Sequence, residues 1–375
     1  MNNNHQNKKI DRFFLFMTFA LAVSGFIIFL SASLGLLLKD SNGFEYTAIK
    51  QTISLGLGII IFFVFSQIPY LVLKKHAFFI FIGAIAINIL LFIPSLALNH
   101  GGATRWIDLG FVTFQPSEFL KIAFVLYMAA WIFYAKDRIG TFKYGLFPYL
   151  VIMAVLTAIL LQQSDTDTLA IIGLTGILML AIAGASIRHM VVAGLLMIGL
   201  IIGVIVFRPY ALERVRTFFD HSADSQGSGY QINQSLIAIG SGQLTGRGFG
   251  QSIQKFGYLP QPTDDSIFAV AAEEFGFIGS VIVILLYLLF AISAFRIGAR
   301  SKDIFGGLTA SGIAILIISE SFLNMAAMLG LIPLSGLPLL FVSHGGTALI
   351  ITLAAAGIVA NISKYGGSER SLVKS

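Results

Sequence analysis

The chain has 375 residues, of which 57% are hydrophobic and 11% charged, and its formal net charge is +6. Soluble domains carry about 25% charged residues, so this composition excludes an ordinary soluble protein and indicates an integral membrane protein. Cysteine is absent, which excludes disulfides, thiolate metal sites and a thiol nucleophile. The basic excess would suit nucleic acid, but its distribution favours membrane orientation instead, and we expect no nucleic-acid partner.

Ten apolar runs are each long enough to cross about 30 Å of hydrocarbon as a helix. The first, Phe13–Leu38, is longer than the apolar core of a signal peptide, so we expect it to be an uncleaved span. The sequence predicts an all-α integral membrane protein, one domain over residues 1–375 with a bundle of about ten transmembrane helices. The runs are at about 13–38, 51–67, 77–98, 116–135, 144–163, 167–185, 188–207, 266–295, 304–328 and 339–361.

The distribution of Lys and Arg predicts the orientation in the membrane. Ten spans put both ends on one side, and short loops rich in Lys and Arg face the cytoplasm. We therefore expect cytoplasmic tails at about 1–12 and 362–375, and a large extracytoplasmic loop at about 208–265 between the seventh and eighth helices. The predicted cytoplasmic set is Lys8, Lys9, Arg12, Lys74, Lys75, Lys136, Arg138, Lys143, Arg188, Arg296, Arg300, Lys302, Lys364, Arg370 and Lys374, against Lys39, Lys50 and Arg105 in the short outer loops.

The outward loop at about 99–115 leads into the fourth predicted helix. Pro116 fits the first helical turn, where its missing N–H costs nothing. Glu118 and Lys121 then lie three residues apart on one helix face, and charges inside a membrane need a partner or a wet cavity. Two interpretations stay open for them, a structural ion pair or the border of a polar cavity open to the outer face. Arg105 is either an interfacial cation or an anion-binding group.

Two aspartates precede the sixth predicted helix. Asp165 and Asp167 lie in the segment 161–170, at the predicted outer edge of the membrane. A capping role is the favoured interpretation, with Asp167 as the N-cap residue of the helix. The alternative is that the two carboxylates help to hold a divalent cation.

The segment from Gly229 to Gly279 is predicted to be an extended, glycine-rich loop that passes into the eighth helix at Ser266. Asp264 and Asp265 immediately precede that helix, and either could cap it and favour its dipole. One carboxylate suffices for capping, so two in succession suggest a functional site. The same long loop contains four further basic residues, Arg214, Arg216, Arg247 and Lys255.

Other polar residues fall inside the predicted eighth and ninth helices. Glu273 and Glu274 lie about two turns beyond the aspartates. A charged side chain inside the membrane is costly in free energy, so both glutamates are expected to have partners. Glu320 and Asn324 are four residues apart, and a hydrogen bond between them is the expected explanation. The segment 330–346 then predicts a fixed external turn, in which His344 is expected to pack or hydrogen-bond rather than act as a base.

Four long motifs occur in one order along this ten-span pattern. They are GGATRWIDLGFVTFQPSEFLK, GYQINQSLIAIGSGQLTGRGFGQSIQKFGYLP, DDSIFAVAAEEFGFIG and GLIPLSGLPLLFVSHGG. With these motifs the chain resembles the SEDS family (shape, elongation, division and sporulation), which includes RodA and FtsW, over nearly its whole length. The second motif is closer to FtsW than to RodA.

The resemblance implies a peptidoglycan glycosyltransferase that polymerises lipid II at the outer face of the cytoplasmic membrane, for septal cell-wall synthesis in cell division. The alternatives are a flippase for lipid-linked precursors and a RodA-type elongation polymerase. No cofactor is certain, and a divalent Mg or Mn ion is left open. The implied partners are lipid II, undecaprenyl-diphosphate-linked glycan, a class B penicillin-binding protein transpeptidase, other division proteins and membrane lipids.

The family's motif L-P-E-x-H-T-D matches LPQPTDD without a gap, so the resemblance places the essential aspartate at Asp265. Because a lipid diphosphate leaves as a stabilised anion, one general base suffices for such a transfer, with cations near the leaving group. The family's R-W and P-S-E-x-x-K motifs fall on Arg105, Glu118 and Lys121. We therefore expect Asp265 as the catalytic base and a substrate-binding set of Arg105, Glu118, Lys121, Arg214, Arg216, Arg247, Lys255 and Asp264.

The chain departs from the family pattern at several positions. Gln261 replaces the usual Glu, Thr263 replaces the usual His, and Asp264 is an additional acid. Glu320 replaces a usual Gln. Two short motifs also differ, QSDTDT (163–168) in place of Q-P-D-L-G-T and SHGG (343–346) in place of S-Y-G-G.

Overall fold

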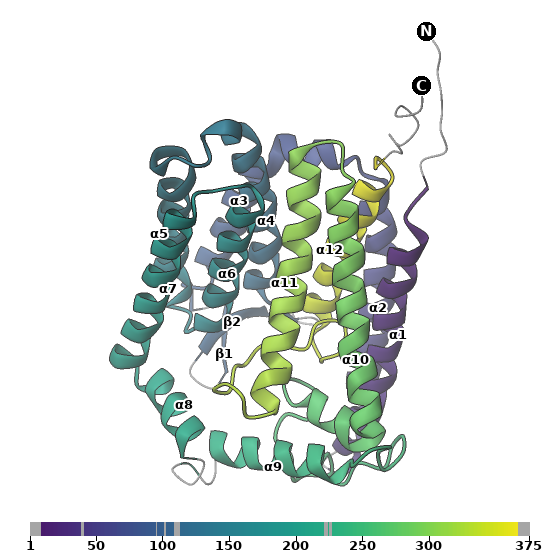
Figure 1. Cartoon of the computed structure of the whole chain (residues 1–375). Helices are drawn as coiled ribbons and strands as arrows, with labels where there is room; N and C mark the ends of the chain where they lie inside the picture. The colour runs from purple at the N-terminus through teal and green to yellow at the C-terminus, as the bar shows by residue number, and fades with distance from the viewer. Residues whose placement is uncertain are drawn as a thin grey trace.

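A computed structural model describes residues 9–38, 41–94, 96–100, 103–108, 113–220, 224 and 227–366. Within these residues, long helices stand side by side in one bundle (Figure 1). Several residues used in the sequence argument lie outside the described ranges, namely Lys8, Lys39, Gly101, Gly102, 109–112, Arg370 and Lys374.

Each predicted apolar run contains a helix. Nine helical segments of the described chain are long and apolar enough to cross a membrane, and Thr166–Ile182 is a shorter apolar helix of 17 residues. The chain is thus a helical membrane protein, and the count of ten spans stays a prediction. The helices are α1 (Arg12–Ser33), α2 (Ser41–Gln67), α3 (Tyr70–Leu90), α4 (Pro116–Ala135), α5 (Phe147–Leu160), α6 (Thr166–Ile182), α7 (Ile187–Phe207), α10 (Ile267–Ala299), α11 (Ile304–Met328) and α12 (Gly346–Ser363), with short turns η1 (Leu34–Leu38), η2 (Lys136–Arg138) and η3 (Phe142–Leu146).

Three predicted boundaries were wrong. The helix α2 begins ten residues before the predicted run, because its first turns are polar and an apolar window does not detect them. The helix α3 ends at Leu90, before the predicted end at residue 98. The helix α12 starts at Gly346 instead of residue 339, since the preceding apolar segment forms a non-helical turn.

A small antiparallel sheet forms in the outward loop between α3 and α4. The strands β1 (Ala97–His100), β2 (Ala103–Asp108) and β3 (Thr113–Phe114) pair in the order β1-β2-β3. Ile107 pairs with Ala97 on one side and with Phe114 on the other. These pairings satisfy the backbone groups of the outward loop, which apolar-run analysis treats as unstructured.

The predicted long loop after α7 contains two helices, α8 (Pro209–Phe219) and α9 (Ser228–Ser241). The expectation of an extended loop from Gly229 was therefore wrong over its first part. Ile232, Ser235 and Ala238 are buried at a spacing of three residues, which gives α9 one face to pack against the bundle. Figure 1 shows α8 and α9 at the end of the bundle opposite to the beginning of α1 and the end of α12.

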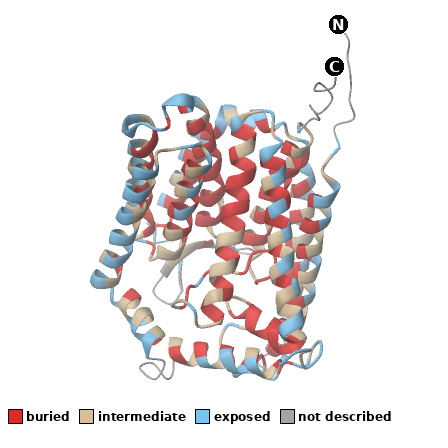
Figure 2. Cartoon of the chain, in the orientation of Figure 1, coloured by how far each residue is buried: buried red, intermediate tan, exposed pale blue. Residues whose placement is uncertain are grey.

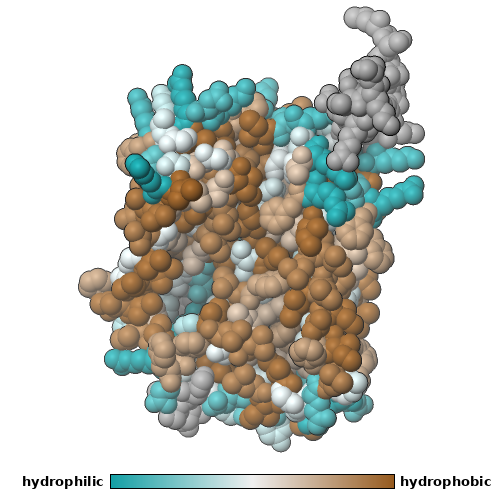
Figure 3. Space-filling view, in the orientation of Figure 1, coloured by the Kyte–Doolittle hydropathy of each residue, from teal (hydrophilic) through white to brown (hydrophobic). Residues whose placement is uncertain are grey.

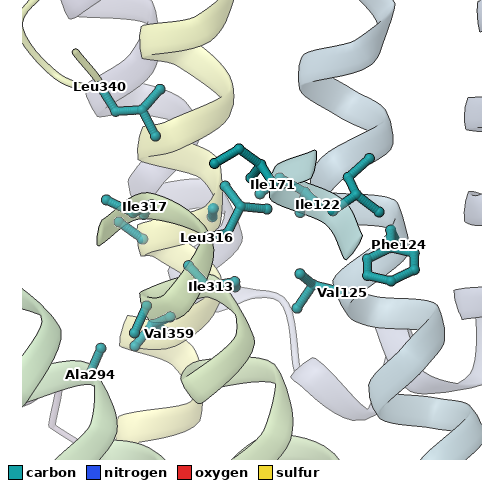
Figure 4. Close-up of a cluster of buried hydrophobic side chains, with 14 of the residues drawn as sticks. Ile122, Phe124, Val125, Ile171, Ala294, Ile313, Leu316, Ile317, Leu340 and Val359 are labelled. Atoms are coloured by element: carbon teal, nitrogen blue, oxygen red, sulfur yellow. The ribbon is translucent and has the colours of Figure 1, made fainter. Parts of the chain in front are cut away.

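The core lies between α4, α6, α10, α11 and α12. Figure 4 shows Val125 of α4 pointing toward Ile313 of α11, and both side chains are buried. Buried residues gather inside the bundle and exposed ones on its outer helices (Figure 2). Between two hydrophilic ends, the outer surface is a broad hydrophobic belt (Figure 3), as expected for a protein that faces lipid.

The helix α10 is broken at Gly276, whose backbone has φ 67° and ψ −165°. A Cβ at this position would lie 2.3 Å from the backbone nitrogen of Gly246, so glycine is required for both conformation and space. The loop after α9 satisfies the backbone at the break. Phe277 N–H donates to Gln243 O at 2.9 Å, and Arg247 N–H donates to Glu273 O at 3.0 Å.

The beginning of α1 and the end of α12 lie together. Asp11 N–H donates to Ser363 Oγ at 3.0 Å, and Figure 1 shows the beginning of α1 and the end of α12 at the same end of the bundle. This end also holds the turn from α10 to α11, where Asp303 caps α11 by accepting a hydrogen bond from Gly306 N–H at 2.8 Å.

Candidate active site

Two aspartates lie in a tight turn at the start of α10. Asp264 N–H and Ser266 N–H both donate to Gln261 O, at 3.1 and 3.3 Å, and Gln261 adopts a φ of 49°. Ser266 is the N-cap residue of α10 and makes no side-chain capping bond. Neither Asp264 nor Asp265 therefore caps the helix, and the capping interpretation was wrong for both.

The backbone of this turn is fixed to the segment before α12. Ser343 Oγ donates to Asp264 O at 2.6 Å, and Asn324 Nδ2 of α11 donates to Asp265 O at 2.8 Å. His344 N–H donates to the carbonyl of Thr263 at 2.7 Å. Three consecutive carbonyls are thus bonded, which holds the aspartate side chains on a rigid backbone.

The Asp265 carboxylate faces the long-loop helices. Gln231 Nε2 of α9 donates to Asp265 Oδ1 at 3.1 Å. Burial raises the pKa of Asp265 to about 6, against the opposing effects of the Gln231 hydrogen bond and the positive charge of Arg214. Burial and the neighbouring charge of Asp265 raise the pKa of Asp264 to about 7. At neutral pH, Asp265 is therefore the more ionised of the two.

His344 contributes packing rather than a charge. Its ring stacks on Phe29 with ring centroids 5.7 Å apart. Burial and the positive charge of Lys50 lower the pKa of His344, so its imidazole is neutral at physiological pH.

Two arginines converge beside this turn. Arg214 Nη1 of α8 lies 3.1 Å from Asp167 Oδ2, and Arg105 Nη1 of β2 lies 3.7 Å from Asp165 Oδ1. A Cβ built on Gly336 would lie 3.8 Å from Arg214 Nη2 and 3.9 Å from Arg105 Nη1. Both guanidinium groups therefore border the same small space above Gly336.

The two aspartates before and within α6 have separate roles. Asp165 is the N-cap residue and accepts a hydrogen bond from Thr168 N–H, so the expectation that Asp167 caps the helix was wrong. Asp167 instead pairs with Arg214 and accepts a hydrogen bond from Gly336 N–H at 3.4 Å. Among the described residues, no three His, Asp or Glu side chains form a group that could hold a metal ion.

An apolar cavity of about 290 Å³ opens next to the arginines. Side chains of α6, α7, α8, α11 and the segment 332–337 line it, with Asp167 and Arg214 as the charged lining residues. Figure 3 shows hydrophilic atoms at the bottom of a recess in the apolar belt, between α7 and α11. Four buried polar atoms in this region have no hydrogen-bond partner, which is rare in folded proteins. They are Arg105 Nε, Asp165 Oδ2, Tyr210 Oη and Ser335 Oγ.

Glu118 and Lys121 form an ion pair, one of the two interpretations left open by the sequence, with 2.8 Å between Lys121 Nζ and Glu118 Oε1. A third residue that the sequence analysis did not connect completes the group, since Lys121 Nζ also lies 2.6 Å from Glu320 Oε2 of α11. The hydrogen bond expected between Glu320 and Asn324 is replaced by these contacts and by the Asn324 bonds to Asp265 O and Leu337 O.

Arg247 and Lys255 pair with the two buried glutamates of α10, which confirms that Glu273 and Glu274 have partners. Lys255 Nζ lies 2.6 Å from Glu274 Oε1, and Lys255 is fully buried. Arg247 Nε lies 3.3 Å from Glu273 Oε1. Ser31 of α1 also donates to Glu274 at 2.6 Å. This second cluster fixes the loop after α9 to α1 and α10.

The structure thus brings Arg105, Arg214, Asp264 and Asp265 to one region, and engages Arg247 and Lys255 elsewhere. Arg216 lies on the exposed side of α8. Sequence reasoning missed the contribution of Gln231, because the helix α9 was not predicted. The available signal was the helical spacing of the apolar residues Ile232, Leu236 and Ile239.

Comparisons with known proteins give the family. The family model described as "Cell cycle protein", whose name joins FtsW, RodA and SpoVE, matches residues 11–367. A "Probable peptidoglycan glycosyltransferase FtsW" of Geobacter sp. (strain M18) is 35% identical over 353 residues, covering 94% of this chain and 96% of the relative. "Stage V sporulation protein E" of Bacillus subtilis (strain 168) is 33% identical over 355 residues, covering 95% and 97%.

Solved structures share the fold. A chain of a structure described as "Structural coordination of polymerization and crosslinking by a peptidoglycan synthase complex" matches with a TM-score of 0.78 and 24% identity, covering 95% of this chain and 98% of that one. The Thermus thermophilus rod shape determining protein RodA matches with a TM-score of 0.71 and 22% identity, covering 98% and 100%. With the profile match over residues 11–367, the chain belongs to the FtsW, RodA and SpoVE family of cell cycle proteins.

Proposed function

We propose that this protein is a peptidoglycan glycosyltransferase that polymerises lipid II, with Asp265 as its general base. The observation that carries the proposal is the position of Asp265, on a rigid turn within the electrostatic reach of Arg214, which lines an apolar cavity. A carboxylate, a pair of cations and an apolar recess are the groups that a lipid diphosphate substrate requires. The names of the relatives from Geobacter and the solved synthase complex support the same activity.

The chemistry needs one base. A sugar hydroxyl of the acceptor attacks the anomeric carbon of the donor, and the bond from that carbon to the diphosphate oxygen breaks with inversion. Asp265 accepts the hydroxyl proton, which is typically worth 10²–10⁴-fold in rate. The diphosphate leaves as a stabilised anion, so the second carboxylic acid of a glycosidase has no counterpart here.

We assign Arg105 and Arg214 to the diphosphate. Their guanidinium groups border the space above Gly336, and arginine suits phosphate because it offers several donors in a planar fork. Positive charge fixed near the departing oxygen lowers the barrier without reorganisation. The apolar cavity beside Arg214 then takes the start of the polyprenyl chain, and the unpartnered oxygens of Tyr210 and Ser335 face ligand atoms.

The other candidate residues support this site in different ways. Glu118 and Lys121 border it by holding α4 to α11 through Glu320. Asp264 is the more protonated neighbour of the base at neutral pH. Arg247 and Lys255 fix the loop that leads to Asp265, and exposed Arg216 adds positive charge to the approach path of an anionic substrate.

We further propose that the active face is extracytoplasmic, with both chain ends in the cytoplasm, at the division septum. The strong excess of Lys and Arg at the end where α1 begins supports this orientation. A class B penicillin-binding protein transpeptidase is the proposed partner, together with other division proteins. The solved synthase complex, whose description joins polymerization and crosslinking, supports such a pairing.

The rival function is transport of a lipid-linked precursor, which the break in α10 at Gly276 would suit because transporters contain discontinuous helices. The test uses liposomes that contain the protein, its transpeptidase partner and fluorescent lipid II in the outer leaflet. Polymerisation yields long, muramidase-sensitive glycan with little exchange between leaflets. Rapid exchange without polymer would favour transport and overturn the proposal. Localisation to the septum, compared with the lateral wall, separates division from a RodA-type elongation role.

A further inference from the structure

A second, larger cavity lies at the opposite end of the bundle from Asp265. Its volume is about 670 Å³, within the range of roughly 300–1,000 Å³ that holds compact ligands. It lies where α4, α6 and α10 end and α11 begins. Its lining includes Ile132, Ile182, Phe295 and Leu308 on the apolar side, with Lys136, Ser301 and Lys302 on the polar side.

The cavity contains two lysines that form no close ion pair with a described carboxylate. Neither Lys136 nor Lys302 lies within 4.0 Å of a carboxylate in the described part of the chain. Of the two acids that line the cavity, Asp303 is already engaged, since it caps α11 and lies 3.8 Å from Lys74 Nζ. The second acid that lines the cavity is Asp137. Arg138, Arg296 and Arg300 flank the same helix ends, so the rim is positive.

Lys136 is held in an unusual backbone conformation. Its φ of 40° and ψ of −119° are rarely adopted by residues other than glycine. Such conformations are unfavourable and persist where the surrounding structure enforces them, often at ligand sites. Here the strain turns the chain sharply at the end of α4 and places a lysine on the cavity rim.

The apolar lining points to an occupant with a hydrocarbon part. Phe295 and Leu308 belong to helices that continue into the apolar belt, and the lysines lie at the helix ends, where Figure 3 shows the belt giving way to a hydrophilic end. Long basic side chains at a membrane surface extend toward lipid phosphates while their stems cover apolar surface. Basic pockets between helix ends at the cytoplasmic side bind anionic headgroups.

We propose that this cavity binds one anionic phospholipid, with its phosphate between Lys136 and Lys302 and its acyl chains along Ile132, Phe295 and Leu308. A soluble phosphate compound would leave the apolar side of the cavity uncovered, so the lipid is the better fit. The site is distinct from the catalytic region, and its test does not depend on polymerase activity.

The first experiment measures lipid retention by native mass spectrometry after exchange into mixtures of phosphatidylglycerol and phosphatidylcholine. The wild type retains phosphatidylglycerol selectively, and the double variant Lys136→Gln/Lys302→Gln retains at least tenfold less. The control is Lys75→Gln/Lys143→Gln, which removes equal charge at the same end of the molecule outside the cavity and leaves retention unchanged. Equal loss in both double variants would mean a general charge effect and would overturn the proposal.

Two further variants separate a lipid site from a structural role. Ala299 also lines the cavity. Ala299→Trp fills the cavity and keeps both lysines, and it lowers retention as much as the double lysine change. Asp137→Asn removes a negative charge from the rim and increases retention. If the lysines only stabilise helix ends, the double lysine variant loses the same thermal stability in either lipid, and Asp137→Asn has no effect on retention. Displacement of the lipid by millimolar inorganic phosphate would also contradict the proposal, since it would indicate a site for soluble anions.

Discussion

Lys121 and Glu320 are separated by 199 residues in sequence, yet Lys121 Nζ lies 2.6 Å from Glu320 Oε2 in the interior of the bundle. Glu118 Oε1 lies 2.8 Å from the same nitrogen. One ammonium therefore holds two carboxylates, and all three side chains are at most 3% exposed. This group joins α4 to α11, the helix whose Asn324 fixes the carbonyl of Asp265.

The three members of this group differ in what their loss leaves behind. Lys121→Met leaves two buried carboxylates without a cation, and we expect a loss of about 3–5 kcal/mol in stability. Glu320→Gln leaves one lysine with one carboxylate and keeps hydrogen-bonding capacity, so we expect a loss of about 1 kcal/mol or less. Thermal unfolding in detergent measures both. Adding Glu118→Gln to Lys121→Met should recover part of the stability, and equal costs for the lysine and glutamate variants would contradict the shared-cation arrangement.

The pH dependence of polymerisation follows from Asp265. A general base acts when ionised, and burial raises the pKa of Asp265 to about 6. Activity is therefore full above this pH and falls about tenfold per pH unit below it. The Arg214 charge lowers the pKa of Asp265. Arg214→Gln removes this charge and raises that pKa, so the pH below which activity falls should move to a higher value. A matched control, Arg216→Gln on the exposed side of α8, should leave this pH unchanged.

Gly336 offers a direct test of the proposed diphosphate site. Its missing side chain leaves the space that Arg105 and Arg214 border. Gly336→Asp introduces a carboxylate that competes with the substrate diphosphate, and we expect KM for lipid II to rise at least tenfold. Gly336→Asn has nearly the same shape without the charge and should change KM far less. Equal effects of the two variants in steady-state kinetics would indicate steric obstruction rather than competition for the arginines.

The second buried cluster predicts unequal stability effects for two cations. Lys255 is fully buried against Glu274, so Lys255→Met should cost about 3–5 kcal/mol. Arg247 is 39% exposed, and Glu273 keeps hydrogen bonds from Ser252 Oγ and Ile253 N–H without it. Arg247→Gln should therefore cost less than about 1 kcal/mol. Thermal unfolding distinguishes them, and similar midpoints for the two variants would contradict the burial of Lys255.

Features encoded locally were predictable from the sequence. Apolar runs located the helices, Pro116 began α4 as expected, and the three-residue spacing of Glu118 and Lys121 placed them on one helix face, where an ion pair was one of two interpretations. The same local logic failed for Glu320, which was assigned to Asn324 on its own helix. Only the packing of α11 against α4 places a stronger partner, Lys121, within reach.

Backbone conformation explains the remaining differences between the predicted and the observed roles of the site residues. Asp165 and Asp167 both suit the N-cap position by residue type, and the start of α6 at Thr166 selects Asp165. Ser266 takes the N-cap position of α10, which frees Asp264 and Asp265 for other roles. The position of Gln231 beside Asp265 depends on α9, a helix whose glycine-rich start hides its buried face from an apolar-run analysis.

The measurement that tests the catalytic assignment most directly compares Asp265→Asn with Asp264→Asn in reconstituted lipid II polymerisation. An amide keeps the shape of the side chain but accepts no proton at working pH. We expect Asp265→Asn to insert, bind its transpeptidase partner and bind lipid II, yet form no polymer. Asp264→Asn should retain a substantial rate, because the base remains. A dead Asp264→Asn variant beside an active Asp265→Asn variant would move the base by one residue, and normal polymerisation by both variants would contradict the catalytic role of this turn.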